Sequence, residues 1–153
     1  MNTATHKLLP SHNVLLIEDD VAAIDLARRA AANSGIGLEL SVLDSVDAVL
    51  EWLGSSIVKK KSVPHIILLD IKLPKLDGLA VLRKLRMHAA TREIPIVVFS
   101  AEYTQADVQM AYQIGANSFI AKPADLQQFS EFFRAQLTYW LEPRQRKLAF
   151  SAK

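Results

Sequence analysis

Five short hydrophobic runs divide the chain, and they lie at residues 14–17, 38–43, 66–69, 96–99 and 118–121. The first, third and fourth runs are unbroken and rich in branched side chains. Strands that are buried on both faces of a sheet have this pattern. The runs therefore predict five short strands.

Segments with helical spacing follow these runs. Some of them begin or end at residues that favour helix ends: Ser45 is a suitable N-cap, and Gly54 and Gly115 are suitable stops. The predicted helices span residues 22–33, 45–53, 77–87, 104–114 and 125–141. Strand and helix alternate five times, which predicts an α/β fold with a five-stranded parallel sheet, doubly wound as (βα)5.

The chain of 153 residues is long enough for one domain with a sizeable core. We expect this domain to span residues 12–141, with tails at 1–11 and 142–153 and no second domain. The absence of cysteine excludes disulfides and thiolate metal sites. There is no signal peptide and no apolar run near the roughly 18 residues of a membrane span. These features predict a cytoplasmic protein without a membrane partner.

The formal net charge of +2 is small, and acidic and basic residues are mixed along the chain. Two minor basic clusters, at residues 59–61 and 144–147, are typical of a solvated loop and a solvated tail. A nucleic-acid surface would show a larger basic cluster. We therefore expect no nucleic-acid partner.

The first polar residues beyond the predicted strands suggest where the chemistry lies. Because the carboxyl ends of parallel strands meet at one edge of a sheet, these residues should project into one crevice. Taken singly, each has an ordinary explanation, such as a helix cap for Asp20 or a surface charge for Lys122. The set comprises Glu18, Asp19 and Asp20, then Asp70, then Ser100 and Ala101, then Lys122 and Pro123.

Three of these carboxylates, those of Glu18, Asp19 and Asp70, would crowd negative charge that Lys122 alone does not offset. All the available ligands are oxygens, which favours a hard divalent cation, Mg²⁺ or Mn²⁺. A carboxylate can also act as a nucleophile and form an acyl phosphate. Asp70 ends the central strand, so we predict that it receives a phosphoryl group, with Lys122 and the cation balancing charge.

The segments VLLIEDD at 14–20, LDIKLPKLDG at 69–78, FSA at 99–101 and AKP at 121–123 resemble the receiver domains of two-component response regulators. The resemblance covers roughly residues 12–141. It implies a flavodoxin-like or CheY-like fold, and it implies that Asp70 accepts phosphate from a histidine kinase. The chain would then be a phosphoacceptor and not an enzyme.

The resemblance also implies roles for the residues around Asp70. Mg²⁺ would be held by Glu18, Asp19, Asp70 and the backbone carbonyl of Lys72. The phosphoryl group would be contacted by Ser100, Ala101 and Lys122, with Phe119 turning inward as Ser100 moves. The Lys122–Pro123 peptide bond is expected to be cis. Lys72 and Glu102 border the mouth of the site, and we hypothesise that they pair and tune the phosphoryl lifetime.

The last helix suggests how the signal leaves. Receivers commonly form homodimers through the fourth helix, fifth strand and fifth helix, and the resemblance implies the same here. The expected dimer surface comprises Phe119, Phe129, Phe132, Tyr139 and Trp140. The segments 116–129 and 139–142 and the long 54–64 connection are similar to those of single-domain regulators of cyanobacterial phytochromes. A phytochrome-type histidine kinase is therefore the expected partner.

Two alternatives remain open from the sequence. The chain could be a receiver-like adaptor that binds partners without phosphorylation, although every site residue is present. It could instead be a phosphohydrolase like the haloacid dehalogenases, which also form an aspartyl phosphate. That chemistry needs a second Asp two residues after the nucleophile, and Lys72 occupies this position.

Overall fold

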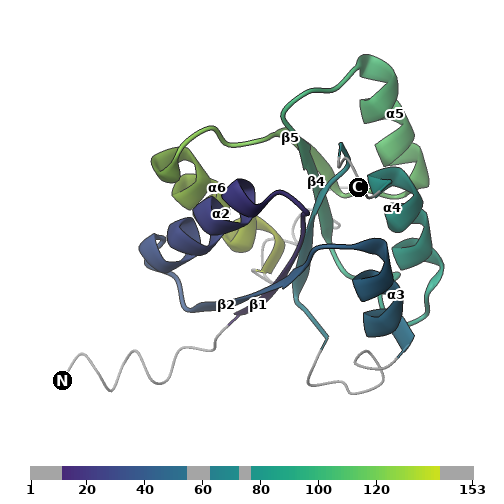
Figure 1. Ribbon diagram of the computed structural model, residues 1–153, viewed down its shortest axis with the longest axis horizontal. Helices are drawn as coiled ribbons and strands as arrows, with labels where there is room; N and C mark the ends of the chain where they lie inside the picture. The colour runs from purple at the N-terminus through teal and green to yellow at the C-terminus, as the bar shows by residue number, and fades with distance from the viewer. Residues whose placement is uncertain (1–11, 55–62, 73–76, 142–153) are drawn as a thin grey trace, which may run out of the picture.

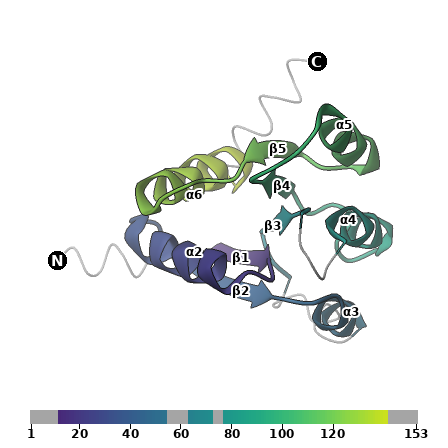
Figure 2. The same cartoon turned by 45° about the horizontal axis from the view of Figure 1, so that its top comes forward.

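The strands form one parallel sheet with helices on both of its faces (Figures 1 and 2). The structure is a computed structural model that describes residues 12–54, 63–72 and 77–141. Within these residues the order of strands across the sheet is β2-β1-β3-β4-β5. The strands are β1 (His12–Ile17), β2 (Leu38–Leu43), β3 (Ile66–Asp70), β4 (Ile96–Ser100) and β5 (Ser118–Ala121). The predicted doubly wound α/β fold is confirmed.

Two helices cover one face of the sheet and three cover the other (Figure 2). The pair is α2 (Val21–Asn33) and α6 (Leu126–Leu141); the three are α3 (Val46–Gly54), α4 (Gly78–Met87) and α5 (Gln105–Ile114). No helix in the described ranges is long and apolar enough to cross a membrane. The predicted tails lie outside the described residues, so the domain boundaries stay a prediction.

The caps explain where several helices begin and end. Asp20 caps α2 by accepting a hydrogen bond from the Ala23 backbone N–H at 3.1 Å, as an N-cap aspartate does. Asp77 caps α4, and Thr104 forms a capping box with Asp107 at the start of α5. Gly115 follows α5 with a φ of 131°, a backbone conformation that favours glycine.

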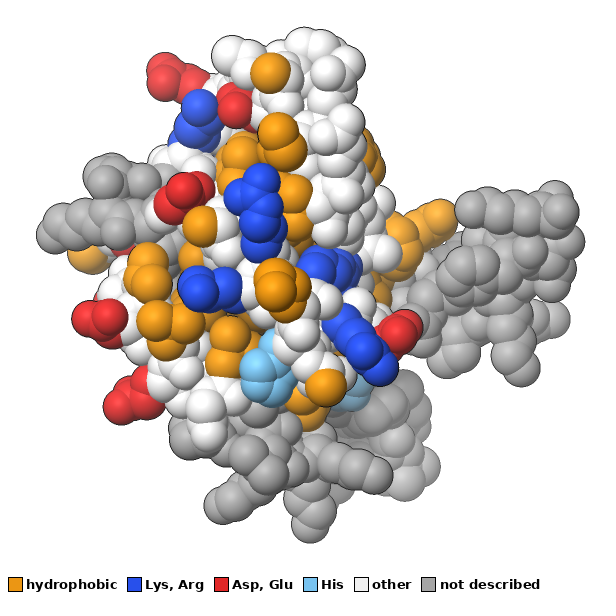
Figure 3. All heavy atoms as spheres, turned by 90° about the vertical axis from the view of Figure 1, so that its right-hand side faces the viewer, with side chains coloured by type: hydrophobic (Ala, Val, Ile, Leu, Met, Phe, Trp, Pro, Cys, Tyr) orange, Lys and Arg blue, Asp and Glu red, His pale blue; other side chains and the backbone are white. Residues whose placement is uncertain are grey.

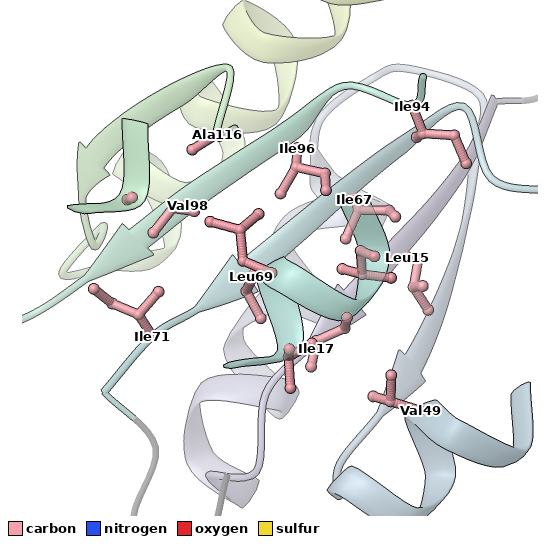
Figure 4. Packing of buried hydrophobic residues seen from close by; sticks show 14 of the residues in the cluster. Leu15, Ile17, Val49, Ile67, Leu69, Ile71, Ile94, Ile96, Val98 and Ala116 are labelled. Atoms are coloured by element: carbon pink, nitrogen blue, oxygen red, sulfur yellow. The ribbon is translucent and has the colours of Figure 1, made fainter. Parts of the chain in front are cut away.

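The two faces of the sheet bury different side chains. The face under α3, α4 and α5 is aliphatic, with Leu15, Ile17, Ile67, Leu69 and Val98 at its centre (Figure 4). The face under α2 and α6 is aromatic. It gathers Phe99 from β4 with Phe129, Phe132 and Phe133 from α6. Each face carries one partly buried tryptophan, Trp52 on the aliphatic side and Trp140 on the aromatic side.

The aromatic face overturns part of the expected dimer surface. Phe129 is 1% exposed and Phe132 is 7% exposed, so neither side chain can reach a partner. The ring of Phe132 lies 6.0 Å from that of Phe99, centroid to centroid, and 5.6 Å from that of Phe129. The sequence placed Phe132 on the dimer surface and not in the core. The strand side chains that widen this core, Phe99 above all, lie far from Phe132 in the chain.

The outer face of α3, α4 and α5 mixes Lys and Arg side chains with hydrophobic ones (Figure 3). Leu50 on α3 is 43% exposed and Met87 on α4 is 82% exposed here, beside Lys84 and His88. One basic residue of α4 does not join this surface. Arg86 turns inward at the amino ends of the strands instead.

Arg86 is the centre of a hydrogen-bond cluster. Its Nε donates to the Gly115 carbonyl at 2.8 Å, and its Nη2 donates to Asn117 Oδ1 at 2.7 Å. Its Nη1 donates to three carbonyls, those of Thr91, Arg92 and Ile94, at 3.3, 3.1 and 2.8 Å. One guanidinium thus joins the end of α4 to the segments that lead into β4 and β5.

Candidate phosphoacceptor site

The carboxyl edge of the sheet brings together three of the side chains that were predicted to meet there, those of Glu18, Asp70 and Lys122. Glu18 follows β1, Asp70 ends β3, and Lys122 follows β5. The Lys122 Nζ lies 2.7 Å from Glu18 Oε1 and 2.7 Å from Asp70 Oδ2. Glu18 is 1% exposed and Asp70 is 3% exposed, so both carboxylates are buried against a single ammonium.

The charge balance at this edge is uneven. Burial raises the pKa of Glu18 to about 7; the hydrogen bond from Lys122 works against this rise, and the charge of Asp70 adds to it. Burial opposes the charge of Lys122, but hydrogen bonds from its ammonium to Asp70 and Glu18 outweigh it and raise the lysine pKa. The two shifts differ in their main cause, which is burial for Glu18 and the two neighbouring carboxylates for Lys122. With both acids ionised, two buried carboxylates share one cation, which leaves surplus negative charge.

That surplus charge suits a hard cation. The other carboxylate oxygens already accept hydrogen bonds, Asp70 Oδ1 from the Lys72 backbone N–H at 2.9 Å and Glu18 Oε2 from the Asp20 backbone N–H at 3.1 Å. Among the described residues no three His, Cys, Asp or Glu side chains stand together as a metal-ligand group. Any Mg²⁺ here would need backbone carbonyl and water ligands as well, which is the coordination that Mg²⁺ prefers.

Ser100 is completely buried at the end of β4, and its hydroxyl points into the following loop. The Ser100 Oγ donates to the Glu102 backbone carbonyl at 2.7 Å. Ala101 and Glu102 are exposed beside it. The hydroxyl is therefore near the site but engaged with the β4–α5 loop.

Lys72 does not pair with Glu102 as hypothesised. Its Nζ lies 3.2 Å from Asp107 Oδ2, on the first turn of α5. The capping box fixes the Asp107 carboxylate through Thr104, so pairing there requires the lysine to order only its own side chain. The Thr104 backbone N–H, together with Lys72, lowers the pKa of Asp107.

The expected cis bond before Pro123 is also wrong. The described part of the chain contains no cis peptide bond. The trans form of an X–Pro bond is favoured by about 0.5–1 kcal/mol. With the trans bond, Lys122 still reaches both carboxylates.

Phe119 is half-buried on β5 and lies among aromatic residues that the sequence interpretation did not include. Its ring centroid is 4.9 Å from that of Tyr103, and its backbone N–H donates to the Tyr112 hydroxyl at 3.0 Å. Tyr103 and Tyr112 are 44% and 49% exposed. The available signal in the sequence was two tyrosines close to α5, Tyr103 just before it and Tyr112 within it.

Gly78 allows α4 to begin directly against the backbone of the phosphoacceptor candidate. A Cβ at this position would lie 2.7 Å from the Asp70 carbonyl oxygen and would overlap the Ile71 Cα. Only a residue without a side chain fits this approach. The pair Asp77-Gly78 thus caps α4 and seats it behind Asp70.

A buried aspartate at the end of the central strand, with a lysine and a second acid beside it on a (βα)5 sheet, defines a receiver-type site. Residues 14–134 match the response regulator receiver domain, and the chain belongs to this family.

Some individual relatives and solved structures are similar to this chain over most of their length. The chain is 30% identical over 134 residues to the response regulator Rcp1 of Synechocystis, which covers 87% of this chain and 91% of Rcp1. Its structure is similar to that of the phosphorylated cyanobacterial phytochrome response regulator RcpA, with a TM-score of 0.74 and 28% identity over 87% of this chain and 96% of RcpA. It is also similar to the Mn²⁺-bound form of Rcp1, with a TM-score of 0.71 and 29% identity over 86% of this chain and 96% of Rcp1.

Proposed function

We propose that this protein is a response regulator that accepts a phosphoryl group on Asp70 from a histidine kinase. The observation that carries the proposal is the buried Asp70 carboxylate with Lys122 Nζ at 2.7 Å. An Asp70 carboxylate oxygen attacks the phosphorus atom of the phosphohistidine of the kinase. The bond between phosphorus and the histidine nitrogen breaks, and the imidazole leaves. The protein acts as a phosphoacceptor and supplies no second carboxylate for substrate turnover at position 72.

The neighbouring side chains would support this transfer. Lys122 offsets charge on the transferred oxygens, and Ser100 turns its hydroxyl from the Glu102 carbonyl to a phosphoryl oxygen. Glu18, Asp19, Asp70 and the Lys72 carbonyl would hold Mg²⁺ or Mn²⁺, which supplies positive charge to the phosphoryl oxygens. The arrangement of two buried carboxylates around a single ammonium supports this cation.

The proposed kinase is of the phytochrome type. The support is the similarity to RcpA, a phytochrome response regulator, across nearly the whole of both chains. A phosphotransfer profile against a panel of histidine kinases would test this partner. Phosphotransfer from unrelated kinases, with none from phytochrome kinases, would contradict this assignment.

The proposed output is a homodimer through α5, β5 and α6. Of the residues first expected there, Phe119 and Trp140 are partly exposed and Tyr139 is 48% exposed. Tyr103 and Tyr112 add two further exposed aromatic side chains next to Phe119. Aromatic side chains are enriched at the centres of interfaces, which supports the assignment.

Phosphate uptake from labelled acetyl phosphate with Mg²⁺ tests the central proposal. The wild-type protein should gain one phosphoryl group that hydroxylamine removes, as it does from an acyl phosphate, and Asp70→Ala should gain none. Asp25→Asn is a matched control, because Asp25 is an exposed aspartate paired with Arg29. A wild-type protein that takes up no phosphate, yet still binds its kinase, would support the adaptor alternative. Continuous release of phosphate from added phosphomonoesters would support the hydrolase.

A further inference from the structure

Lys72 connects three parts of the carboxyl edge. Its backbone N–H donates to Asp70 Oδ1 at 2.9 Å, and its backbone forms a bridge with Asp77 at the start of α4. Its side chain extends the other way, to Asp107 on α5, with Nζ and Oδ2 at 3.2 Å. A single residue thus links the carboxylate of Asp70 to the beginnings of two helices.

Asp107 is a fixed anchor for this lysine. Its Oδ2 accepts the Thr104 backbone N–H at 2.9 Å, and its own backbone N–H donates to Thr104 Oγ1 at 3.1 Å. The Asp107 side chain is only 17% exposed, whereas that of Lys72 is 50% exposed. The aspartate is therefore the partner that further hydrogen bonds hold in place, and the lysine is the more exposed one.

The position of this ion pair matters more than its strength. Asp70 ends β3 and Ser100 ends β4, and these strands are neighbours in the sheet. The pair runs from the segment after β3 to the helix after β4. It therefore closes a ring outside Asp70 and Ser100, made of the Lys72 backbone, the two side chains and the β4–α5 loop.

We propose that Asp107 is a positioning residue that holds Lys72, and through it the Ile71–Lys72 backbone, against the start of α5. This inference rests on the proposed phosphorylation of Asp70. By keeping the two segments together, the pair limits the access of water to the aspartyl phosphate. It also keeps the Lys72 N–H directed at the Asp70 carboxylate.

Asp107→Asn separates the charge from the cap. The amide oxygen of asparagine can still accept the Thr104 N–H, so the capping box is kept and only the ion pair is lost. Exposed ion pairs are weak, so we expect the half-life of the aspartyl phosphate to shorten about two- to five-fold. Asp107→Glu, the residue usual at this position of a capping box, should restore at least half of the loss.

Three further results separate positioning from a general structural effect. The difference between Asp107→Asn and wild type should shrink at high salt, because salt screens exposed charges. The double variant Asp107→Asn/Lys72→Met should be no shorter-lived than either single variant. Asp25→Asn, which removes an exposed pair on α2, should leave the half-life unchanged. Additive effects of the two substitutions, or a salt-independent loss, would overturn the proposal.

A longer half-life in Asp107→Asn would also overturn it, since Asp107 would then be withholding Lys72 from the phosphoryl group. Hydrogen exchange of the Lys72 N–H in the unphosphorylated protein tests the positioning role of Asp107 without phosphate. We expect this exchange to quicken about two- to five-fold in Asp107→Asn. Unchanged exchange of the Lys72 N–H in Asp107→Asn would refute the positioning role of Asp107. A wild-type protein that takes up no phosphate would refute only the proposed function.

Discussion

Two half-buried cations stand at opposite edges of the sheet, and their partners differ in kind. At the carboxyl edge, Lys122 faces the charged carboxylates of Glu18 and Asp70. At the amino edge, the Arg86 guanidinium donates to four carbonyls and one side-chain amide. The first set of partners can change its charge, and the second cannot.

The pKa shifts follow this difference. Burial lowers the pKa of Arg86, and its neutral partners do not reverse this. Around Lys122 the carboxylates raise the lysine pKa, while burial raises the pKa of Glu18 to about 7. The amino edge is thus a fixed joint, whereas the carboxyl edge keeps a charge imbalance that a cation or a phosphoryl transfer can use.

The largest effect should come from breaking the fixed joint. Arg86→Met would leave several partly buried carbonyls without a donor, so we expect a loss of about 3 kcal/mol in the free energy of unfolding. Urea denaturation would measure it. Arg83→Met, which alters an exposed arginine of the same helix, should cost far less. Equal losses would mean that the Arg86 cluster contributes little to stability.

The second-largest effect should come from a substitution at Gly78, which lies against the backbone of Asp70. In Gly78→Ala the new methyl group would overlap the backbone of Ile71 and Asp70, so we expect a loss of about 2 kcal/mol and slower phosphate uptake. Gly54→Ala is the control, because nothing lies within 4 Å of a Cβ placed at Gly54. If both variants took up phosphate at the wild-type rate, the seating of α4 would not matter to the site.

Mg²⁺ should stabilise the carboxyl edge alone. At ten times its dissociation constant, a cation that binds only the folded state adds about 1.4 kcal/mol to the free energy of unfolding. The melting temperature should rise with Mg²⁺ in the wild-type protein and not in Asp70→Ala. Sodium chloride at matched ionic strength is the control. An equal rise in both proteins would place the cation elsewhere.

The smallest effect should be a dependence on pH at the amino edge. Burial, and then the nearby His65, lowers the pKa of His12 below its ordinary value of 6.5. The unfolded chain then binds a proton more readily than the folded one, so stability should fall as the pH drops below about 6.5. His12→Asn should flatten this part of a stability–pH curve. A curve unchanged by the substitution would exclude His12 as the cause.

Features that depend on residues close together in the chain could be predicted from the sequence. Each site carboxylate or lysine is the first polar residue after a strand, so Glu18, Asp70 and Lys122 were placed by the strand pattern alone. The predicted second strand, residues 38–43, agrees with β2. The first strand begins at His12 and not at Val14, because His12 pairs with Leu38 on the neighbouring strand.

What could not be predicted depends on contacts between distant segments. Arg86 resembled an ordinary solvated arginine on a helix, since its acceptors lie five to thirty-one residues further along the chain. Lys72 was expected to pair with Glu102 because both border the mouth of the site. Its actual partner, the Asp107 carboxylate, is held in place only once α5 is capped. The burial of Phe132 likewise required the ring of Phe99 from another strand.

The unlike faces of the sheet also give the protein two optical reporters. Trp52 on α3 packs against the aliphatic cluster, and Trp140 on α6 packs against the aromatic one, where its Nε1 donates to Gln136 Oε1 at 3.1 Å. The sequence contains only these two tryptophans. Trp52→Phe and Trp140→Phe would each leave a single tryptophan, which can be excited selectively over the tyrosines. Emission from the first variant would follow the side of the sheet under α2 and α6, and emission from the second would follow the side under α3, α4 and α5.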